Sequence, residues 1–363
     1  MYNWQYKDWA NFSYNPTAIQ ETMVTFTKNQ HTMHVMFKNL TPTQEQDEII
    51  RFMIAEAEKT AEIEGEYISR TDLMSSIKNK FGLNATPQNV KDKRANAMSN
   101  LLFAVKNSYN EHLTLTTIKK WHALLFEGSK YINAGKWRTG KEPMQVVSGA
   151  AHREIIHYEA PPSYRIPAEM KQFVNWYNTF GVATTNDALI KTAIAHLYFE
   201  SIHPFEDGNG RIGRAIAEKC LAESLGKPLL LSLSTTIEKN KKQYYEAFKT
   251  AQLTLEITDW IVYFAGVIAQ AQEDAVAAVT FSLAKARFFD KFEHLLNQRQ
   301  SKAINKMFDA GTGGFEGGMT AKKYISIAKT TKATATRDLQ ELANHKILTQ
   351  QGDGRSTHYI LNL

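Results

Sequence analysis

One short stretch, residues 203–214, gathers the residue types best suited to chemistry: a base, a carboxylate, two glycines and two arginines. His203 can take up a proton near neutral pH. Gly208 and Gly210 flank Asn209, and glycines let a backbone approach a ligand and turn its N–H groups toward an anion. The stretch therefore predicts an anion site with a base beside it.

The charged residues of the stretch indicate which anion would bind. Arg211 and Arg214 are three residues apart at the start of a predicted helix, and their guanidinium forks suit phosphate oxygens. The helix N-terminus adds roughly 0.3–1 kcal/mol per anionic charge. Asp207 supplies a hard oxygen ligand, and Mg²⁺ is usually held by one carboxylate with phosphate oxygens and water. A polyphosphate with Mg²⁺ is the expected guest.

Two predicted helices position this loop. Apolar residues between Asp187 and Phe199 recur at three- and four-residue spacing, which predicts a mostly buried helix that delivers His203 to a fixed place. Ile212, Ile216 and Cys220 recur every fourth residue and predict a second helix. The expected arrangement is helix, loop, helix, with a polar pocket at the turn.

The stretch resembles the signature of the Fic family: His-Pro-Phe, any residue, Asp or Glu, Gly-Asn-Gly-Arg, two residues, Arg. Every specified position is matched at residues 203–214, and the similarity extends over roughly residues 110–265. The resemblance implies an all-helical core and transfer of AMP from ATP, with Mg²⁺, to a Ser, Thr or Tyr hydroxyl of a target protein. It implies His203 as the catalytic base and Asp207, Gly208, Asn209, Gly210, Arg211 and Arg214 as ATP-binding residues, with Asp207 on the metal.

An upstream segment is similar to the family's inhibitory pattern. Thr43 with Gln46 is interpreted as a capping box that starts a helix running to about Gly65. Thr60 and Glu64 are four residues apart and share a helix face, while Gly65 permits close helix approach. The hypothesis is an ion pair between Glu64 and Arg214 that blocks productive ATP binding.

Two further segments bear on the nucleotide. Residues 135–149 combine glycine, proline and β-formers, which predicts a hairpin. In the family such a flap covers the nucleotide and pairs with the target; an ordinary surface hairpin is the alternative. The resemblance also puts Tyr244 and Gln252 beside adenine or ribose, with core packing as an equal competitor. The flap residues implied at the adenosine side are Val146, Val147, Ser148 and Gly149.

The C-terminal part differs in composition. A glycine-rich loop at 311–318 precedes predicted helices at 320–329 and 334–345 and two strands, which resembles a winged helix-turn-helix. Its second helix would enter the major groove of DNA, and Arg355 would touch phosphate from the wing. Residues 281–363 hold thirteen Lys and Arg against seven Asp and Glu, so the formal charge of +6 belongs to this part. DNA contact through residues 320–363 and service as a dimerisation or protein-docking module both remain open.

The fold class expected is all-α: a Fic-type helical core with a small β-hairpin flap, plus a C-terminal winged helix domain. We expect an N-terminal helical module at 1–100, a catalytic domain at 101–270 and the winged helix domain at 281–363. One cysteine excludes a disulfide framework, and the lack of a long apolar run indicates a cytoplasmic protein away from membranes.

The chemistry of the loop leaves other functions open, because it stabilises a phosphate transition state without naming the donor. One alternative is a Fic enzyme that transfers another phosphate-containing group or removes AMP. Another is a DNA-binding regulator whose pocket only senses a nucleotide. The intact His203 argues against a sensor, which needs phosphate-binding groups but no base.

Overall fold

The computed structural model describes residues 1–148 and 155–363; the side chains of Val147, Ser148, Ile155 and Arg355 are not described. The chain forms two compact units, Met1–Glu273 and Asp274–Leu363. No helix in the described part is long and apolar enough to cross a membrane. Gly149, predicted beside adenosine, lies outside the described residues.

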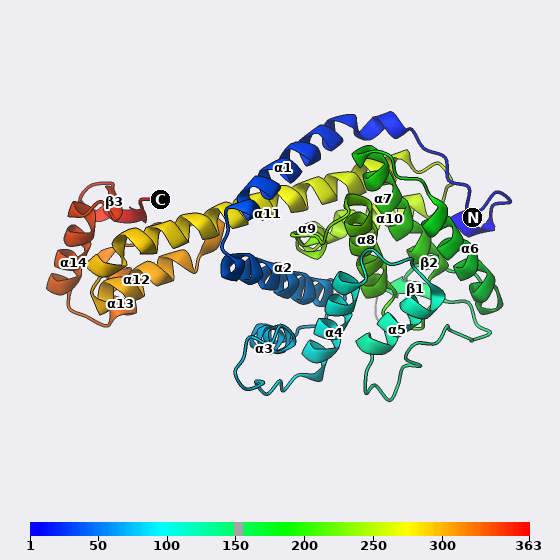
Figure 1. Cartoon of the computed structure of the whole chain (residues 1–363), viewed down its shortest axis with the longest axis horizontal. Helices are drawn as coiled ribbons and strands as arrows, with labels where there is room; N and C mark the ends of the chain where they lie inside the picture. The colour runs from blue at the N-terminus through cyan, green and yellow to red at the C-terminus, as the bar shows by residue number, and fades with distance from the viewer. Residues whose placement is uncertain (149–154) are drawn as a thin grey trace. The chain divides into compact units, whose positions relative to one another are not determined.

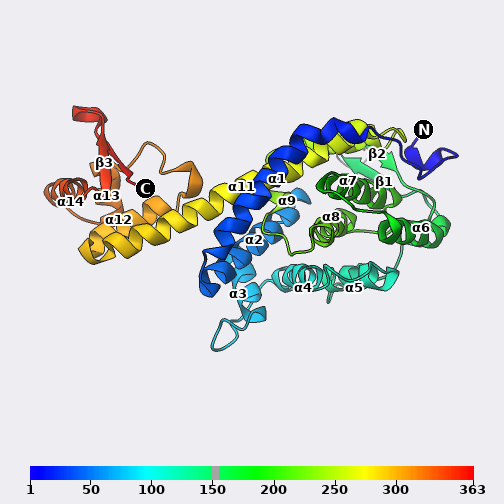
Figure 2. The same cartoon turned by 45° about the horizontal axis from the view of Figure 1, so that its top comes forward.

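Helices make up most of the first unit (Figures 1 and 2), as the predicted all-α class requires. They are α1 (Gln20–Lys38), α2 (Pro42–Ile63), α3 (Arg70–Lys80), α4 (Lys93–Asn107), α5 (Leu115–Leu125), α6 (Ile166–Thr179), α7 (Thr185–Ile202), α8 (Asn209–Leu225), α9 (Leu233–Lys239), α10 (Lys241–Ala251) and the first part of α11 (Thr258–Phe292).

The centre of this unit is the pair α7 and α8, which lie against each other in both views (Figures 1 and 2). α7 is buried along nearly its whole length, from Ala188 to Ile202. A helix that is apolar all round belongs in a core, so its end is held in a fixed place. This confirms the expectation that a buried helix delivers His203 to the loop.

The helix expected to carry the inhibitory pattern, α2, begins two residues earlier than predicted. Thr41, not Thr43, is the N-cap, and its side chain and that of Gln44 form the capping box. Pro42 follows at the first helical position, where a missing N–H costs nothing. Both threonines are followed by Gln three residues later, and the proline after Thr41 decides between them.

The predicted hairpin at 135–149 is displaced along the chain. Its strands are β1 (Gln145–Ser148) and β2 (Ile155–Glu159), which pair antiparallel. Residues 135–138 turn at Gly135, with φ 74°, and the backbone N–H of Arg138 bonds to Pro204 O at 3.0 Å. The glycine and β-forming residues at the start of this segment therefore belong to a turn that is held by a hydrogen bond to Pro204. The paired strands begin later in the chain, at Gln145.

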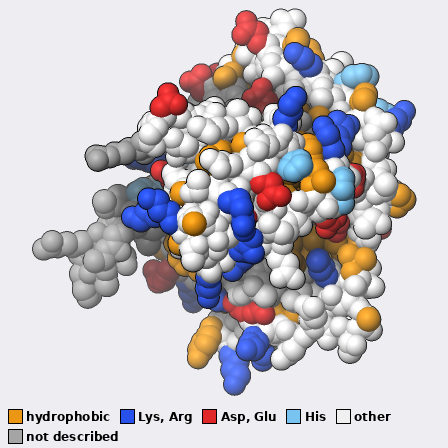
Figure 3. Space-filling model, turned by 90° about the vertical axis from the view of Figure 1, so that its left-hand side faces the viewer, with side chains coloured by type: hydrophobic (Ala, Val, Ile, Leu, Met, Phe, Trp, Pro, Cys, Tyr) orange, Lys and Arg blue, Asp and Glu red, His pale blue; other side chains and the backbone are white. Residues whose placement is uncertain are grey.

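The second unit holds the end of α11, α12 (Gln298–Phe308), α13 (Ala321–Ala328) and α14 (Lys332–Asn344). β3 (Leu348–Gln351) and β4 (His358–Leu361) form an antiparallel pair. The expected order of two helices and a hairpin is present, while its assignment as a DNA-binding winged helix stays a prediction. In Figure 3, Lys and Arg side chains are scattered among acidic, apolar and His side chains on the face shown.

α2 is fixed against α9 by a buried carboxylate. Glu56 is 7% exposed and accepts hydrogen bonds from Ser232 Oγ at 2.8 Å, Ser234 N at 3.0 Å and Ser234 Oγ. These donors lie at the first turn of α9, where backbone N–H groups lack partners inside the helix. The carboxylate therefore ties the helix that carries Thr60 and Glu64 to the core.

We expect Glu56→Ala to destabilise the first unit by about 2–4 kcal/mol, because it leaves buried donors at the start of α9 unsatisfied. Thermal unfolding followed by circular dichroism should show a fall in melting temperature of several degrees. Glu58→Ala is the matched control, since Glu58 pairs with the exposed Arg70. Equal melting temperatures for the two variants would contradict this role of Glu56.

Candidate functional site

The loop between α7 and α8 begins and ends on left-handed backbone. His203 caps α7 with φ 50°, and its N–H bonds to Phe199 O at 3.0 Å. Gly208 precedes α8 with φ 79°, and a Cβ there would lie 2.6 Å from the ring of Phe126. Residue 208 must therefore be glycine for two reasons: its backbone angle and the aromatic ring above it.

Asn209 closes the loop from inside. Its side-chain Oδ1 accepts from Phe205 N and its Nδ2 donates to Phe205 O, both at 2.9 Å, and the residue is 2% exposed. This amide replaces backbone pairing that a loop lacks. The ATP-binding role predicted for Asn209 is thus left to its backbone, because both ends of its amide are already paired.

His122 on α5 is a functional residue that the sequence interpretation missed. Its Nδ1 accepts from Gly135 N at 2.8 Å, so Nε2 carries the proton and donates to Asp207 O at 3.1 Å. Its ring stacks on Phe205 with centroids 3.8 Å apart. Burial lowers the pKa of His122, which keeps the ring neutral in this role. A lone histidine in an apolar helix gives no signal of such a contact.

Arg138 was also missed as a support for the loop, although it falls inside the predicted flap. It is 4% exposed, and its Nε donates to His203 O at 2.7 Å. The same guanidinium bonds to Ile202 O, Pro161 O and Ser163 Oγ. The last carbonyl groups of a helix have no hydrogen-bond partners inside the helix and carry the negative end of its dipole. A cation placed there donates hydrogen bonds to these carbonyls and is attracted by the dipole. Arg138 therefore fixes the backbone on which His203 stands.

His203 is held as a neutral imidazole. Burial, with Arg138 nearby, lowers its pKa to about 4. Its Nδ1 lies 3.8 Å from Glu200 Oε2, and burial raises the pKa of Glu200 to about 8, so this carboxyl is mostly protonated at neutral pH. A general base must be unprotonated to act, and His203 meets that condition.

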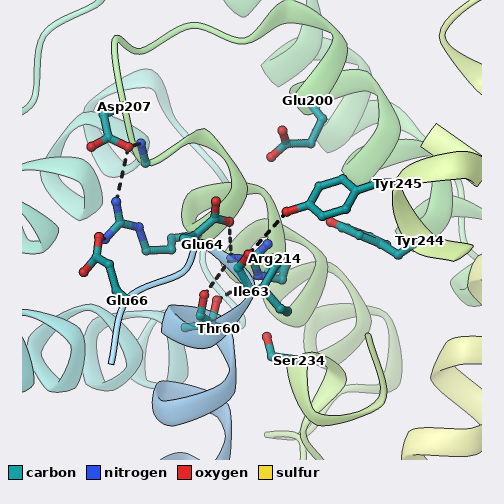
Figure 4. A network of polar contacts seen from close by, with 12 residues as sticks. Thr60, Ile63, Glu64, Glu66, Glu200, Asp207, Arg214, Ser234, Tyr244 and Tyr245 are labelled. Atoms are coloured by element: carbon teal, nitrogen blue, oxygen red, sulfur yellow. Dashed lines mark hydrogen bonds and ion pairs between the residues drawn. The ribbon is translucent and has the colours of Figure 1, made fainter. Parts of the chain in front are cut away.

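Arg214 is paired with Glu64, as the sequence predicts (Figure 4). Its Nη2 lies 2.6 Å from Glu64 Oε1, while Nε donates to Thr60 Oγ1 at 2.8 Å and Nη2 to Thr60 O at 3.1 Å. Burial raises the pKa of Glu64, but the charge of Arg214 and its hydrogen bond hold it below the ordinary value. A Cβ on Gly210 would overlap the Glu64 carboxylate, so this glycine makes room for the pair.

Arg211 has carboxylate partners on both sides. Its Nη1 lies 2.7 Å from Glu66 Oε1 and its Nη2 3.3 Å from Asp207 Oδ1. Glu66 is a partner that the sequence interpretation missed. It comes just after Gly65, which has φ 77° and open space around its Cβ position. The expectation that Gly65 permits close helix approach is therefore wrong; the glycine serves the turn that follows α2.

The residues predicted beside the adenosine are placed differently. Tyr244 is 2% exposed, and its hydroxyl lies 2.8 Å from His196 Nε2. Gln252 is 8% exposed, and its backbone O accepts from Asn3 N at 2.7 Å. Both are engaged in packing, which was the competing interpretation. Val146 lies on β1 opposite Tyr158. An adenosine role for these residues remains a prediction.

The donor set at Asp207 fits a metal that arrives with phosphates. No group of three or more His, Cys, Asp or Glu that could hold a metal ion occurs among the described residues. The Asp207 side chain is 53% exposed, and its Oδ1 accepts from Gly208 N at 2.5 Å. One reachable carboxylate is the donor set with which Mg²⁺ binds a nucleotide phosphate, since the phosphates and water complete the shell.

Comparison with known proteins identifies two regions of the chain. Residues 112–221 match the model of the Fic/DOC family, and residues 2–83 match a domain of unknown function, DUF4172. Among curated relatives, a probable protein adenylyltransferase of Aquifex aeolicus is 34% identical over 95 residues, 26% of this chain and 27% of that protein. The protein adenylyltransferase fic-1 of Caenorhabditis elegans is 27% identical over 144 residues, 40% of this chain. The chain thus spans about a quarter of the length of these relatives.

Solved structures share the fold. A Fic family protein from Desulfovibrio desulfuricans superposes with a TM-score of 0.58 at 19% identity, over 97% of this chain and 98% of that one. A Fic domain containing signaling protein from Bacteroides thetaiotaomicron gives 0.53 at 20% identity, over 72% and 97%. The chain therefore shares its fold with Fic family structures, and its residues 112–221, which include the complete loop signature, match the Fic/DOC family model.

Proposed function

We propose that the chain is a protein adenylyltransferase that transfers AMP from ATP to a Ser, Thr or Tyr hydroxyl of a target protein. The observation that carries the proposal is a neutral, partly buried His203 beside a glycine-framed loop at the N-terminus of α8. The names of the curated relatives support the same reaction. The loop lies within residues 112–221 of this chain, which match the Fic/DOC family model.

The loop would receive the phosphates of ATP. Backbone N–H groups of Asn209–Arg211 lie in the first turn of α8, where they lack partners inside the helix and the dipole favours anions. Asp207 would hold Mg²⁺, which supplies charge neutralisation on the phosphate oxygens when bound. Arg214 would bind the outer phosphate once Glu64 has left it. Each proposed role is supported by a donor or acceptor of suitable type near the start of α8.

His203 would act as the general base. It removes the proton of the target hydroxyl, the oxygen forms a bond to the α-phosphorus, and the bond to the β-phosphate breaks, so pyrophosphate leaves. The backbone of His203 is fixed by Arg138, and its protonation state is set by burial. The chain's own residues therefore keep the base unprotonated and aligned before substrate arrives.

Glu64 would inhibit this reaction by occupying Arg214. The guanidinium of Arg214 forms an ion pair with Glu64 and donates hydrogen bonds to Thr60, and the Arg214 side chain is only 2% exposed. A carboxylate at this position also repels an incoming phosphate. The inhibited state would hold at neutral pH, because the lowered pKa of Glu64 keeps its carboxylate charged there.

Replacement of Glu64 by glycine should raise automodification by labelled ATP about 10- to 100-fold, which corresponds to loss of one charge-assisted hydrogen bond. Glu62→Gly is the matched control, because Glu62 lies two residues away and pairs with Lys59. Mass spectrometry of the product should show the mass of AMP. An unchanged rate in Glu64→Gly would contradict inhibition by Glu64, and another added mass would contradict AMP transfer.

In the Glu64→Gly background, His203→Ala should lower transfer by about 100- to 10,000-fold while ATP affinity stays nearly the same, since the base acts on the hydroxyl. Transfer is measured with labelled ATP and affinity by calorimetry. His112→Ala is the control, because His112 is exposed and lies against Asn178. Equal turnover with and without His203 would rule out this residue as the base.

A further inference from the structure

A cavity of the first unit lies at the C-terminal end of α8, away from the loop at 203–214. It has a volume of about 240 Å³ and is bordered by α1, α2, the end of α4 and the segment after α8. Its apolar wall includes Phe26, Met33, Phe37, Ile49 and Leu230. An engineered apolar cavity of about 150 Å³ binds benzene, so this volume suits a molecule of roughly ten heavy atoms.

The charged side chains that line the cavity carry a net positive charge. Lys106 and Lys227 line it together with one carboxylate, that of Glu45; His34 is the remaining titratable side chain in the lining. Burial lowers the pKa of both lysines, because it removes water from around their ammonium groups. Two ammonium groups against one carboxylate leave one positive charge without a counterion.

Another carboxyl near Lys106 does not supply that counterion. Glu218 on α8 interacts with Lys106, but burial raises the pKa of Glu218 to about 8, so it is mostly protonated at neutral pH. Glu56, whose carboxylate lies near Glu218, already accepts hydrogen bonds from Ser232 and Ser234. The excess positive charge at the cavity is therefore left for a ligand to balance.

An unpaired buried acceptor is the second feature that points to a ligand. Gln272 lines the cavity and is 5% exposed, and its Oε1 has no hydrogen-bond partner. A buried polar atom without a partner is destabilising, so such atoms are rare, and an unseen water, ion or ligand is a common explanation for one. The partner that Oε1 lacks is an O–H or N–H donor.

From these observations we propose that this cavity is a binding site for a small amphipathic monoanion of about eight carbons in all, with one hydroxyl or N–H donor. The apolar wall takes the chain, the ammonium groups of Lys106 and Lys227 take the anionic head, and Gln272 Oε1 accepts from the donor. The site is independent of ATP, because none of its lining residues belongs to the loop at 203–214.

The test uses the full chain and 3-hydroxyoctanoate as the probe, which has these features and about the expected size. Isothermal calorimetry should show binding with one site per chain, and thermal unfolding should shift upward as ligand is added. 1,3-Octanediol, the neutral counterpart with the same donor, should bind at least about tenfold more weakly. Equal affinity for the two ligands, or no binding of 3-hydroxyoctanoate, would overturn the proposal.

Variants locate the site. Lys227→Met should weaken binding of 3-hydroxyoctanoate about tenfold, because it keeps the apolar stem and removes one ammonium group. Lys227 lies in the half-buried segment after α8, so this change leaves the core intact. Lys106→Met should act in the same direction. The control is Lys242→Met, whose side chain is 91% exposed on α10. Binding that is unchanged in Lys227→Met overturns the assignment of this cavity.

Discussion

A buried guanidinium, that of Arg214, is the constraint on which the active-site geometry depends. It is 2% exposed and cannot lose its charge, so an anion must face it at all times. In this structure the anion is Glu64, and Thr60 accepts hydrogen bonds from Nε and Nη2 of the same guanidinium. Removing an anion from such a site without replacing it would cost several kcal/mol. Only another anion, such as a phosphate, can take the place of Glu64.

This requirement explains why α2 is tied so firmly to the core. The helix brings Thr60 and Glu64 to α8, and its Glu56 is bonded to the start of α9. Gly210 leaves out a side chain that would collide with the Glu64 carboxylate. A helix end that frayed would lose the geometry of the ion pair, so packing along α2 and charge at its end support each other.

The sequence predicted the parts of the site that are local. Residues 203–214 show their chemistry in one continuous stretch, and the spacing of Thr60 and Glu64 places both on one helix face. His122 and Arg138 could not be found in this way, because their partners lie 85 and 65 residues away in the chain. Contacts at such separations depend on packing, which a pattern of residue types does not specify.

The residues that hold the loop backbone in place are different from the ion pair of Glu64 and Arg214 that would control the site. Asn209, His122 and Arg138 bond to the loop backbone at Phe205, Asp207 and His203. None of these three makes a hydrogen bond to Glu64 among the contacts of the described residues. Departure of Glu64 would therefore change the partner of Arg214 while the loop keeps its shape. Under the proposed function, such a loop would bind phosphate without reorganisation, which is what electrostatic preorganisation requires of a phosphate-transfer site.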